Sequence, residues 1–511
     1  MSFPWRPFLI GLIGLGLLLR VLAIGLWKEG LTHDESVSYL CAAATQGRYE
    51  RELPRMLDQP LQARDVQAFY ARPQQWSFGV VAHDLAHDDI HPPLYFWMLH
   101  GIHRVVGFDM RSGMVLNTVL TSLLLILLVR HASGTLGPPN APLAVAALWS
   151  LSPAVMLADL EARHYQLLGL IAFAMYIVGR RFWQGTARRA DLVLFTLINA
   201  AGFLTHYYYG FLLFPGLALV IYRHRNSAVT WRYLTSLFMS LILFIGLYPG
   251  IFDFIPNYLN DPEQVAGGKV DHLFRLKALL AAMPELISHG SRWKWSFLLV
   301  LTIMVWVGRK PGVRKVLSAL KGTGPAVDLC SHCAWYLFFS GIFYLSGVSP
   351  TQAVGGAYFS YLWPLVVLLL AHLSERYVRP SVVRMLYLGL TIQLVAVTPP
   401  MVRHSSYLSD LVPREATELM RGSSIIVTDE GRRGQLPRMA IRLVPGSPLR
   451  VVSAAGARSF MPQGTPVSYW MVAGTTDGRI SGITATMTNA GYRSTTIEGD
   501  GHVLAHFERL P

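Results

Sequence analysis

Residues 188–225 read RRADLVLFTLINAAGFLTHYYYGFLLFPGLALVIYRHR. Two apolar runs, 190–205 and 207–223, are joined by a short polar turn and have arginines at their far ends. Apolar runs of about this length are typical of membrane-spanning helices, and short loops rich in Lys and Arg stay in the cytoplasm. The stretch therefore predicts two spanning helices with their basic ends inside and the turn at 205–209 on the outer face.

The same pattern extends over most of the chain. Of its 511 residues, 52% are hydrophobic and 14% are charged, whereas a soluble protein carries about 25% charged residues. Eleven spans are predicted in all, at 7–27, 112–130, 141–158, 162–182, 190–205, 207–223, 231–249, 294–308, 329–347, 357–375 and 381–398. With Arg6 in the cytoplasm, this count places every later short loop that is rich in Lys and Arg in the cytoplasm as well. We call these loops the basic patches. The net charge of +14 then reflects orientation in a membrane, and nucleic acid is not an expected partner.

Residues 91–107, HPPLYFWMLHGIHRVVG, form one more apolar segment, which would be a twelfth span if it crossed the membrane. The segment is short, has two prolines directly after His91, and carries His100, His103 and Arg104. A span here would place each later loop on the opposite side of the membrane, so that the basic patches would lie outside. We therefore expect an amphipathic helix on the outer surface, within a first outer loop at 28–111. Residues 250–293 form the second outer loop.

Residues 401–511 differ in composition from the membrane module at 1–400. Short β-rich runs occur at 423–429, 449–454, 467–474 and 502–509, and a helical pattern lies near 479–491. Such runs, separated by Gly and Ser, predict a small α/β domain. The expected fold is a mainly α, polytopic membrane protein whose long outer loops carry surface helices, with this α/β domain outside the membrane.

Four polar clusters fall on the outer face in this topology. They are His33-Asp34-Glu35, the His/Asp run at 83–91, the segment 159–165, and Thr-His-Tyr-Tyr-Tyr at 205–209. Each alone is compatible with an ordinary polar loop, an interfacial ion pair or an aromatic anchor. The His/Asp run also permits a divalent metal site, which is the less favoured interpretation because its spacing matches no metal-ligand signature. Together, the clusters indicate a cavity for a polar headgroup attached to an apolar tail.

The cluster at 159–165 carries a further expectation about local structure. Glu161 with His164, or Asp159 with Arg163, is expected to share one face of a helix.

At these residues the chain resembles bacterial relatives of the protein O-mannosyltransferases and the aminoarabinose transferases, within the GT-C glycosyltransferase superfamily. The resemblance rests on LTHDESVSYL, HPPLYFWMLH, EARHYQLLGL and LTHYYYGFLL, and it covers about residues 7–400. It implies transfer of a sugar from a polyprenyl-phosphate-linked donor to an acceptor hydroxyl, with inversion. The implied setting is the outer face of a bacterial inner membrane. The implied partners are the donor, membrane lipids and a glycan, lipid or protein acceptor. No cofactor is assigned, and the use of a metal stays open.

The resemblance also assigns roles to individual residues. Asp34 matches the position of the general base, with Glu35 supporting it. Arg163, His206, Arg111 and Lys269 are the candidates for contacts with the leaving phosphate. Further substrate contacts are expected from His33, Asp89, His91, Tyr95, Glu161, Tyr165, Tyr207 and Tyr358.

The chain departs from the family pattern in GGAYFSYLWP, where Ala357 precedes Tyr358 in place of a basic residue. The phosphate anchor is then expected in the second outer loop, at Lys269, Arg275 or Arg292.

Two other classes of function are compatible with a polytopic membrane protein. A transporter or flippase of lipid-linked sugars would share the polytopic plan, but transporters tend to place ionisable residues near the bilayer midplane and to contain repeated halves. A glycan-binding sensor would need its helices only as an anchor, for which eleven spans are excessive. The sequence identifies neither the sugar nor the acceptor.

Overall fold

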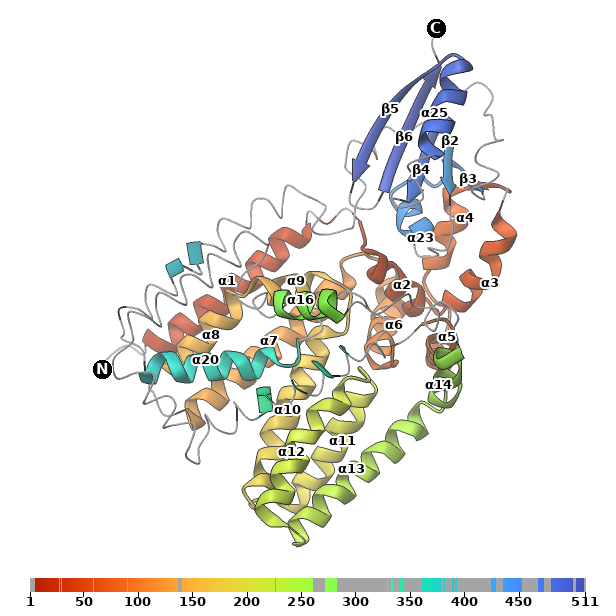
Figure 1. Ribbon diagram of the computed structural model, residues 1–511. Helices are drawn as coiled ribbons and strands as arrows, with labels where there is room; N and C mark the ends of the chain where they lie inside the picture. The colour runs from red at the N-terminus through yellow and green to blue at the C-terminus, as the bar shows by residue number, and fades with distance from the viewer. Residues whose placement is uncertain are drawn as a thin grey trace. The chain divides into compact units, whose positions relative to one another are not determined.

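The computed structural model describes residues 5–26, 28, 30–57, 59–89, 91–136, 140–225, 227–260, 272–282, 329, 332–334, 338, 341–342, 345, 360–377, 381, 388–389, 391–392, 424–428, 435–452, 467–472, 479–499 and 502–509 (Figure 1). The chain divides into two compact units. Unit 1 comprises Met1–Ala23, Ile90–Tyr95 and Met114–Thr398. Unit 2 comprises Ile24–Asp89, Phe96–Gly113 and Pro399–Pro511.

The described residues of unit 1 form helices joined by turns and loops, without a strand. Its helices are α7 (Ser112–Thr135), α8 (Ala141–Ser150), α9 (Pro153–Leu160), α10 (Tyr165–Trp183), α11 (Arg189–Phe203), α12 (Tyr209–His224), α13 (Ala228–Leu247), α14 (Ile251–Asn260), α16 (His272–Ala282) and α20 (Trp363–Tyr377), with most of α1 (Trp5–Leu26). Helices α10 to α13 lie side by side, and α20 lies against α8 and α10 (Figure 1).

Helices α11 and α13 are apolar on their outer as well as their inner faces. Phe195 and Tyr233 are buried between them with ring centroids 4.9 Å apart. Val193 on α11 and Trp231 and Phe238 on α13 are exposed. A helix that is hydrophobic all round is typical of a membrane span.

Among the described residues, α7 and α13 are long and apolar enough to cross a membrane. Helices α8 and α9, bent by 54°, make a third span if they are one. The break has a local cause, because Pro153 lacks a backbone N–H and the Ser152 hydroxyl caps α9 by accepting from Val155 N at 3.3 Å. The predicted spans at 7–27, 162–182, 190–205, 207–223 and 357–375 correspond to α1, α10, α11, α12 and α20. Those at 294–308, 329–347 and 381–398 lie wholly or mostly outside the described residues, and the count of eleven stays a prediction.

Helix α6 (Leu94–Val106) lies in the segment 91–107, the possible twelfth span. It has 13 residues, which is too short for a span of about 20. Its two histidines point into unit 2: Nδ1 of His100 lies 2.7 Å from the carbonyl oxygen of Ala42, and Nε2 of His103 lies 3.0 Å from that of Tyr70. Both rings are buried, so protein atoms, rather than water, cover this polar face.

Unit 2 combines the first outer loop with the C-terminal region. Its helices are α2 (His33–Ala42), α3 (Gln46–Met56), α4 (Ala63–Gln67), η1 (Ala68–Tyr70), α5 (Phe78–Asp88), α23 (Gln435–Ala440) and α25 (Arg479–Asn489), with most of α6. Its strands are β1 (Pro60–Gln62), β2 (Ser424–Thr428), β3 (Pro448–Val452), β4 (Val467–Val472), β5 (Tyr492–Gly499) and β6 (His502–Arg509).

The six strands form one sheet in the order β1-β3-β2-β4-β6-β5. Strand β2 pairs in parallel with β3 and β4, whereas β6 is antiparallel to β4 and β5. The predicted runs near 423–429, 449–454, 467–474 and 502–509 are confirmed as strands, and the run near 479–491 as a helix. Strands β1 and β5 were not predicted. Strand β1 comes from the first outer loop and places Pro60 opposite Arg450 of β3. The boundary between residues 400 and 401 stays a prediction, since the sheet takes strands from both sides of it.

Candidate active site

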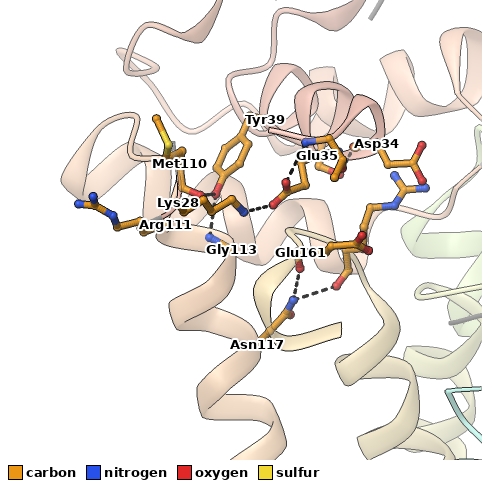
Figure 2. Close-up of polar contacts among 12 residues, drawn as sticks. Lys28, Asp34, Glu35, Tyr39, Met110, Arg111, Gly113, Asn117 and Glu161 are labelled. Carbon is orange, nitrogen blue, oxygen red and sulfur yellow. Dashed lines mark hydrogen bonds and ion pairs between the residues drawn. The ribbon is translucent and has the colours of Figure 1, made fainter. Parts of the chain in front are cut away.

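Glu35 is held in a buried polar arrangement at the first turn of α2. Its Oε1 forms an ion pair with Nζ of Lys28, and both side chains have an exposed fraction of 0%. Its Oε2 accepts a hydrogen bond from the backbone N–H of Thr32 at 3.0 Å, while the Thr32 hydroxyl accepts from the N–H of Glu35 at 3.1 Å. This reciprocal capping box satisfies N–H groups that a helix start leaves open. Both carboxylate oxygens of Glu35 therefore stabilise the start of α2 (Figure 2).

Asp34 precedes Glu35 and has an exposed side chain, with the half-buried His33 beside it. Its backbone carbonyl accepts from the Ser38 hydroxyl at 2.9 Å, so the main chain is fixed. A carboxylate in the first turn of a helix is stabilised by the positive end of the helix dipole. Of the two adjacent carboxylates, Asp34 is the one that lies at the protein surface.

Helix α2 is also fixed to the start of α7 and to the segment directly before it. The Tyr39 hydroxyl donates to the carbonyl of Met110 at 2.9 Å and accepts from the N–H of Gly113 at 3.0 Å (Figure 2). Arg111 in the same segment donates from Nη2 to the carbonyl of Leu26 at 3.2 Å. Arg111, predicted as a phosphate contact, thus has a structural bond at the carbonyl end of α1.

The His/Asp run forms part of the structure around α3 and α5. Oδ2 of Asp84 accepts from the N–H of Gly47 at the start of α3, at 3.1 Å. His83 and His87 are exposed and stack with ring centroids 4.2 Å apart. Asp89 is half-buried directly after α5. In the described part of the chain, no three His, Cys, Asp or Glu residues are grouped so that they could hold a metal ion.

Three histidines and an arginine meet in unit 1 from three separate segments. The ring centroids of His91, His164 and His206 are 5.0 Å (91 to 164), 4.8 Å (164 to 206) and 6.1 Å (91 to 206) apart. Nη2 of Arg163 donates to Nε2 of His91 at 3.2 Å. The four side chains are buried. We call these four residues the histidine–arginine cluster.

Asn117 on α7 fixes the turn that carries Arg163. Its Nδ2 donates to the carbonyl oxygens of Ala158 at 3.1 Å and Arg163 at 3.3 Å. It also donates to the carbonyl oxygen of Glu161 (Figure 2). The N–H of Arg163 donates to the carbonyl of Glu161 at 2.7 Å. One amide group therefore holds three carbonyls of this turn in place.

The expectation that residues at 159–165 share a helix face is wrong. Helix α9 ends at Leu160 and α10 begins at Tyr165, so Glu161, Arg163 and His164 all lie in the turn between them. The helix cannot continue because Glu161 has extended backbone angles, with ψ at 135°.

Burial keeps two of the three histidines neutral. It lowers the pKa of His206 well below its ordinary value, and the nearby His91 and Arg163 lower it further. Burial likewise lowers the pKa of His164, with His206 as the next cause. The N–H of Tyr208 donates to Nδ1 of His206 at 3.0 Å, so the proton of the neutral ring is on Nε2.

The His91 tautomer follows from its contact with Arg163. A guanidinium group can only donate hydrogen bonds, so Nε2 of His91 accepts, and the proton of a neutral His91 ring is on Nδ1. The cluster thus combines one fixed positive charge with imidazole N–H donors. Such donors form strong, charge-assisted bonds to carboxylate or phosphate oxygens, and the planar fork of arginine suits phosphate geometry.

Some of the remaining predicted site residues are buried in the described part of the chain, and others lie outside it. Tyr165 is buried with its ring centroid 4.8 Å from that of His164, and the ring of Tyr207 stacks on Phe254 at 4.8 Å. Tyr95 is fully buried on α6. Lys269, Arg292, Ala357 and Tyr358 lie outside the described residues, whereas Arg275 is buried on α16.

Three side chains of this candidate site were not among the predicted site residues. His164 stands beside the chosen Arg163 in EARHYQ, and that adjacency was an available signal. Lys28, seven residues before Glu35, was also visible as a basic residue beside two carboxylates. Asn117 had no signal, since it lies within an apolar run.

Comparison with known proteins adds an independent view of this site. Residues 90–248 match the family described as dolichyl-phosphate-mannose-protein mannosyltransferase, and this range contains the whole histidine–arginine cluster. The fold is similar to that of ArnT from Cupriavidus metallidurans bound to undecaprenyl phosphate, with a TM-score of 0.55 and 10% identity over 99% of this chain and 98% of that chain. The apo state of the same ArnT gives a TM-score of 0.52 and 12% identity over 97% of each chain. No curated protein sequence matches the chain.

The family match over residues 90–248 and the ArnT-like fold support glycosyltransferase activity in this membrane protein. Its described part is mainly helical, and its fold is similar to that of ArnT. The resemblance inferred from the sequence motifs, and the enzyme class it implied, are therefore confirmed.

Proposed function

We propose that this enzyme transfers a sugar from a polyprenyl-phosphate-linked donor to an acceptor hydroxyl, with inversion. The reaction takes place at the extracytoplasmic face of a bacterial inner membrane. The observation that carries this proposal is the histidine–arginine cluster, a buried group of donors with a fixed positive charge at the ends of apolar helices. An apolar bundle suits a polyprenyl chain, and the cluster suits the phosphate. The ArnT of similar fold binds undecaprenyl phosphate, which supports a donor of this class.

In the proposed reaction Asp34 acts as general base. Its carboxylate takes the proton of the acceptor hydroxyl, and the hydroxyl oxygen forms a bond to the anomeric carbon of the sugar. The bond from that carbon to the phosphate oxygen breaks on the opposite face, and polyprenyl phosphate leaves with the electron pair. Asp34 suits this role because its side chain is exposed on a fixed helix start, whereas Glu35 is buried against Lys28.

Negative charge increases on the phosphate as it leaves. The guanidinium of Arg163 balances this charge, and Nε2–H of the neutral His206 donates to a phosphate oxygen. His91 orients Arg163 through their 3.2 Å hydrogen bond. Preorganised donors of this kind are worth about a hundredfold to a thousandfold in rate each. Tyr165 and Tyr207 line the sugar site in this proposal.

The test is transfer by purified enzyme in nanodiscs with a panel of polyprenyl-phosphate sugars and a membrane extract as acceptor. Release of polyprenyl phosphate is measured for wild type, Asp34→Asn and the control Glu52→Gln, which changes an exposed carboxylate on α3. We expect release with one donor, lost in Asp34→Asn and retained in Glu52→Gln. Equal release by all three proteins would remove Asp34 as the base.

A flippase is the second candidate, because it also requires a site for the headgroup of a lipid-linked sugar. The turn positions of Arg163, His164 and His206 argue against it, since transporters use sites near the bilayer midplane. Movement of the lipid-linked sugar across the bilayer, with no release from any donor, would favour the flippase.

A further inference from the structure

The segment 63–70 is attached at one end to the C-terminal region of the chain. Nε2 of Gln67 donates to the carbonyl oxygens of Ala440 at 2.8 Å and Leu443 at 2.9 Å. These carbonyls lie at and just beyond the end of α23, where a helix leaves acceptors open. The adjoining strand β1 pairs with β3 of the C-terminal sheet. One side chain and one strand thus attach this part of the first outer loop to the C-terminal region.

The other end of the segment is attached to α2. The hydroxyls of Tyr70 and Ser36 lie 2.7 Å apart, and both residues are buried. Ser36 is two residues from Asp34. The Tyr70 ring packs against Phe108 with centroids 4.9 Å apart, and its carbonyl lies 3.0 Å from Nε2 of His103. Tyr70 is therefore fixed by its ring and its backbone, and its hydroxyl can transmit that position to α2.

We propose that Gln67 and Tyr70 are positioning residues that couple the C-terminal region to the helix carrying Asp34. The proposal rests on the proposed function, in which Asp34 is the base. Helix α23 also lies directly against α2, so the C-terminal region meets α2 by packing and through the 63–70 segment. A displacement of about 1 Å at a reacting group can cost about a hundredfold in rate. The C-terminal region then supplies no reacting group, but its attachment determines where α2 holds the base.

The test uses the full chain in nanodiscs with the donor found by the panel. Gln67→Met removes both donors at nearly constant size, and Tyr70→Phe removes only the hydroxyl. Each is expected to lower kcat about fivefold, the value of one typical hydrogen bond, with KM for the donor within about twofold of wild type. The loss of kcat in the double variant is expected to be no larger than that of the more impaired single variant, because both changes interrupt the same connection. Arg64→Ala is the control: its side chain is exposed, and its backbone N–H still donates to the carbonyl of Pro445 at 2.9 Å.

Wild-type kcat in both single variants overturns the coupling. Losses that multiply in the double variant, to about 25-fold, also overturn it, because they show two independent effects. If Tyr70→Phe does not fold, Ser36→Ala removes the other hydroxyl of the pair and must reproduce the fivefold loss. Asp34→Asn is measured alongside: full activity in that variant overturns the proposed function, whereas an inactive Asp34→Asn with unaffected Gln67 and Tyr70 variants overturns the coupling alone.

Discussion

Replacing Glu35 by glutamine tests how the start of α2 is stabilised. The variant removes the carboxylate that faces Lys28 where neither side chain has any exposed surface. The amide keeps one of the two oxygens, and its NH2 group cannot accept a hydrogen bond. Either the Thr32 N–H or the Lys28 ammonium therefore faces a donor in place of an acceptor. Removing one partner of a buried ion pair costs about 3–5 kcal/mol. For a unit of the size of unit 2, this corresponds to a thermal midpoint lower by about 6–20 °C.

The assay is thermal unfolding of the full chain in nanodiscs, followed by probes on unit 2. The matched rescue is the double variant Lys28→Met/Glu35→Gln, which removes both charges and leaves glutamine free to keep the capping box. Because apolar replacement of a whole buried pair is often neutral, we expect its midpoint to return close to that of wild type. Glu52→Gln, which breaks the exposed pair with Arg48, is expected to change stability by under about 1 kcal/mol.

Two results would contradict a stabilising role for the Lys28–Glu35 pair. One is a wild-type midpoint for Glu35→Gln, and the other is a double variant no more stable than the single one. The double variant also separates structure from chemistry at this residue. If it is stable and retains kcat within a few-fold of wild type, Glu35 only supports α2; if it is stable and inactive, Glu35 takes part in the reaction.

Three further outcomes are expected. Arg163→Gln removes the charge oriented by His91 and should lower kcat/KM by at least about a hundredfold, together with affinity for polyprenyl phosphate measured by calorimetry. Burial lowers the pKa of His103 from 6.5 to about 4. As the pH falls, the unfolded chain therefore binds a proton at this ring before the folded chain does, and about 3 kcal/mol of stability is lost between pH 6.5 and 4. The loss is measured as unfolding midpoints across that range. Gly47→Ala places a Cβ 2.6 Å from Oδ1 of Asp84 and should destabilise the protein by about 1–3 kcal/mol, read as a lower thermal midpoint.

Each of these outcomes has a matched control. Gly79→Ala adds a methyl group where no atom lies within 4 Å, so a loss equal to that of Gly47→Ala would contradict the steric reason. His103→Gln removes the titrating ring and should flatten the pH dependence; an unchanged pH dependence would assign it to other groups. Arg64→Ala removes an exposed arginine, and a loss comparable to that of Arg163→Gln would show a general charge effect.

Much of the fold could be predicted because its signals are local in the sequence. Hydropathy over about 20 residues marks a span, and alternating β-rich runs mark strands, so α11, α12, β2 and β6 follow from their own residues. The resemblance carried by four short motifs led to the glycosyltransferase class. Strand β1 could not be predicted in this way, since three residues carry no pattern and its pairing partner begins at Pro448.

Composition and local patterns alone establish that this is a membrane protein, that acidic residues begin α2, and that an arginine and two histidines follow apolar helices. Which of these groups meet depends on the folded chain. Arg163 bonds His91 across 72 residues, and the Tyr70 and Ser36 hydroxyls meet across 34. It also separated the two adjacent carboxylates, placing Glu35 in a buried pair and Asp34 at the surface. The physical reason is that hydropathy is summed over neighbours in the chain, whereas burial and hydrogen bonding depend on side chains that only folding brings together.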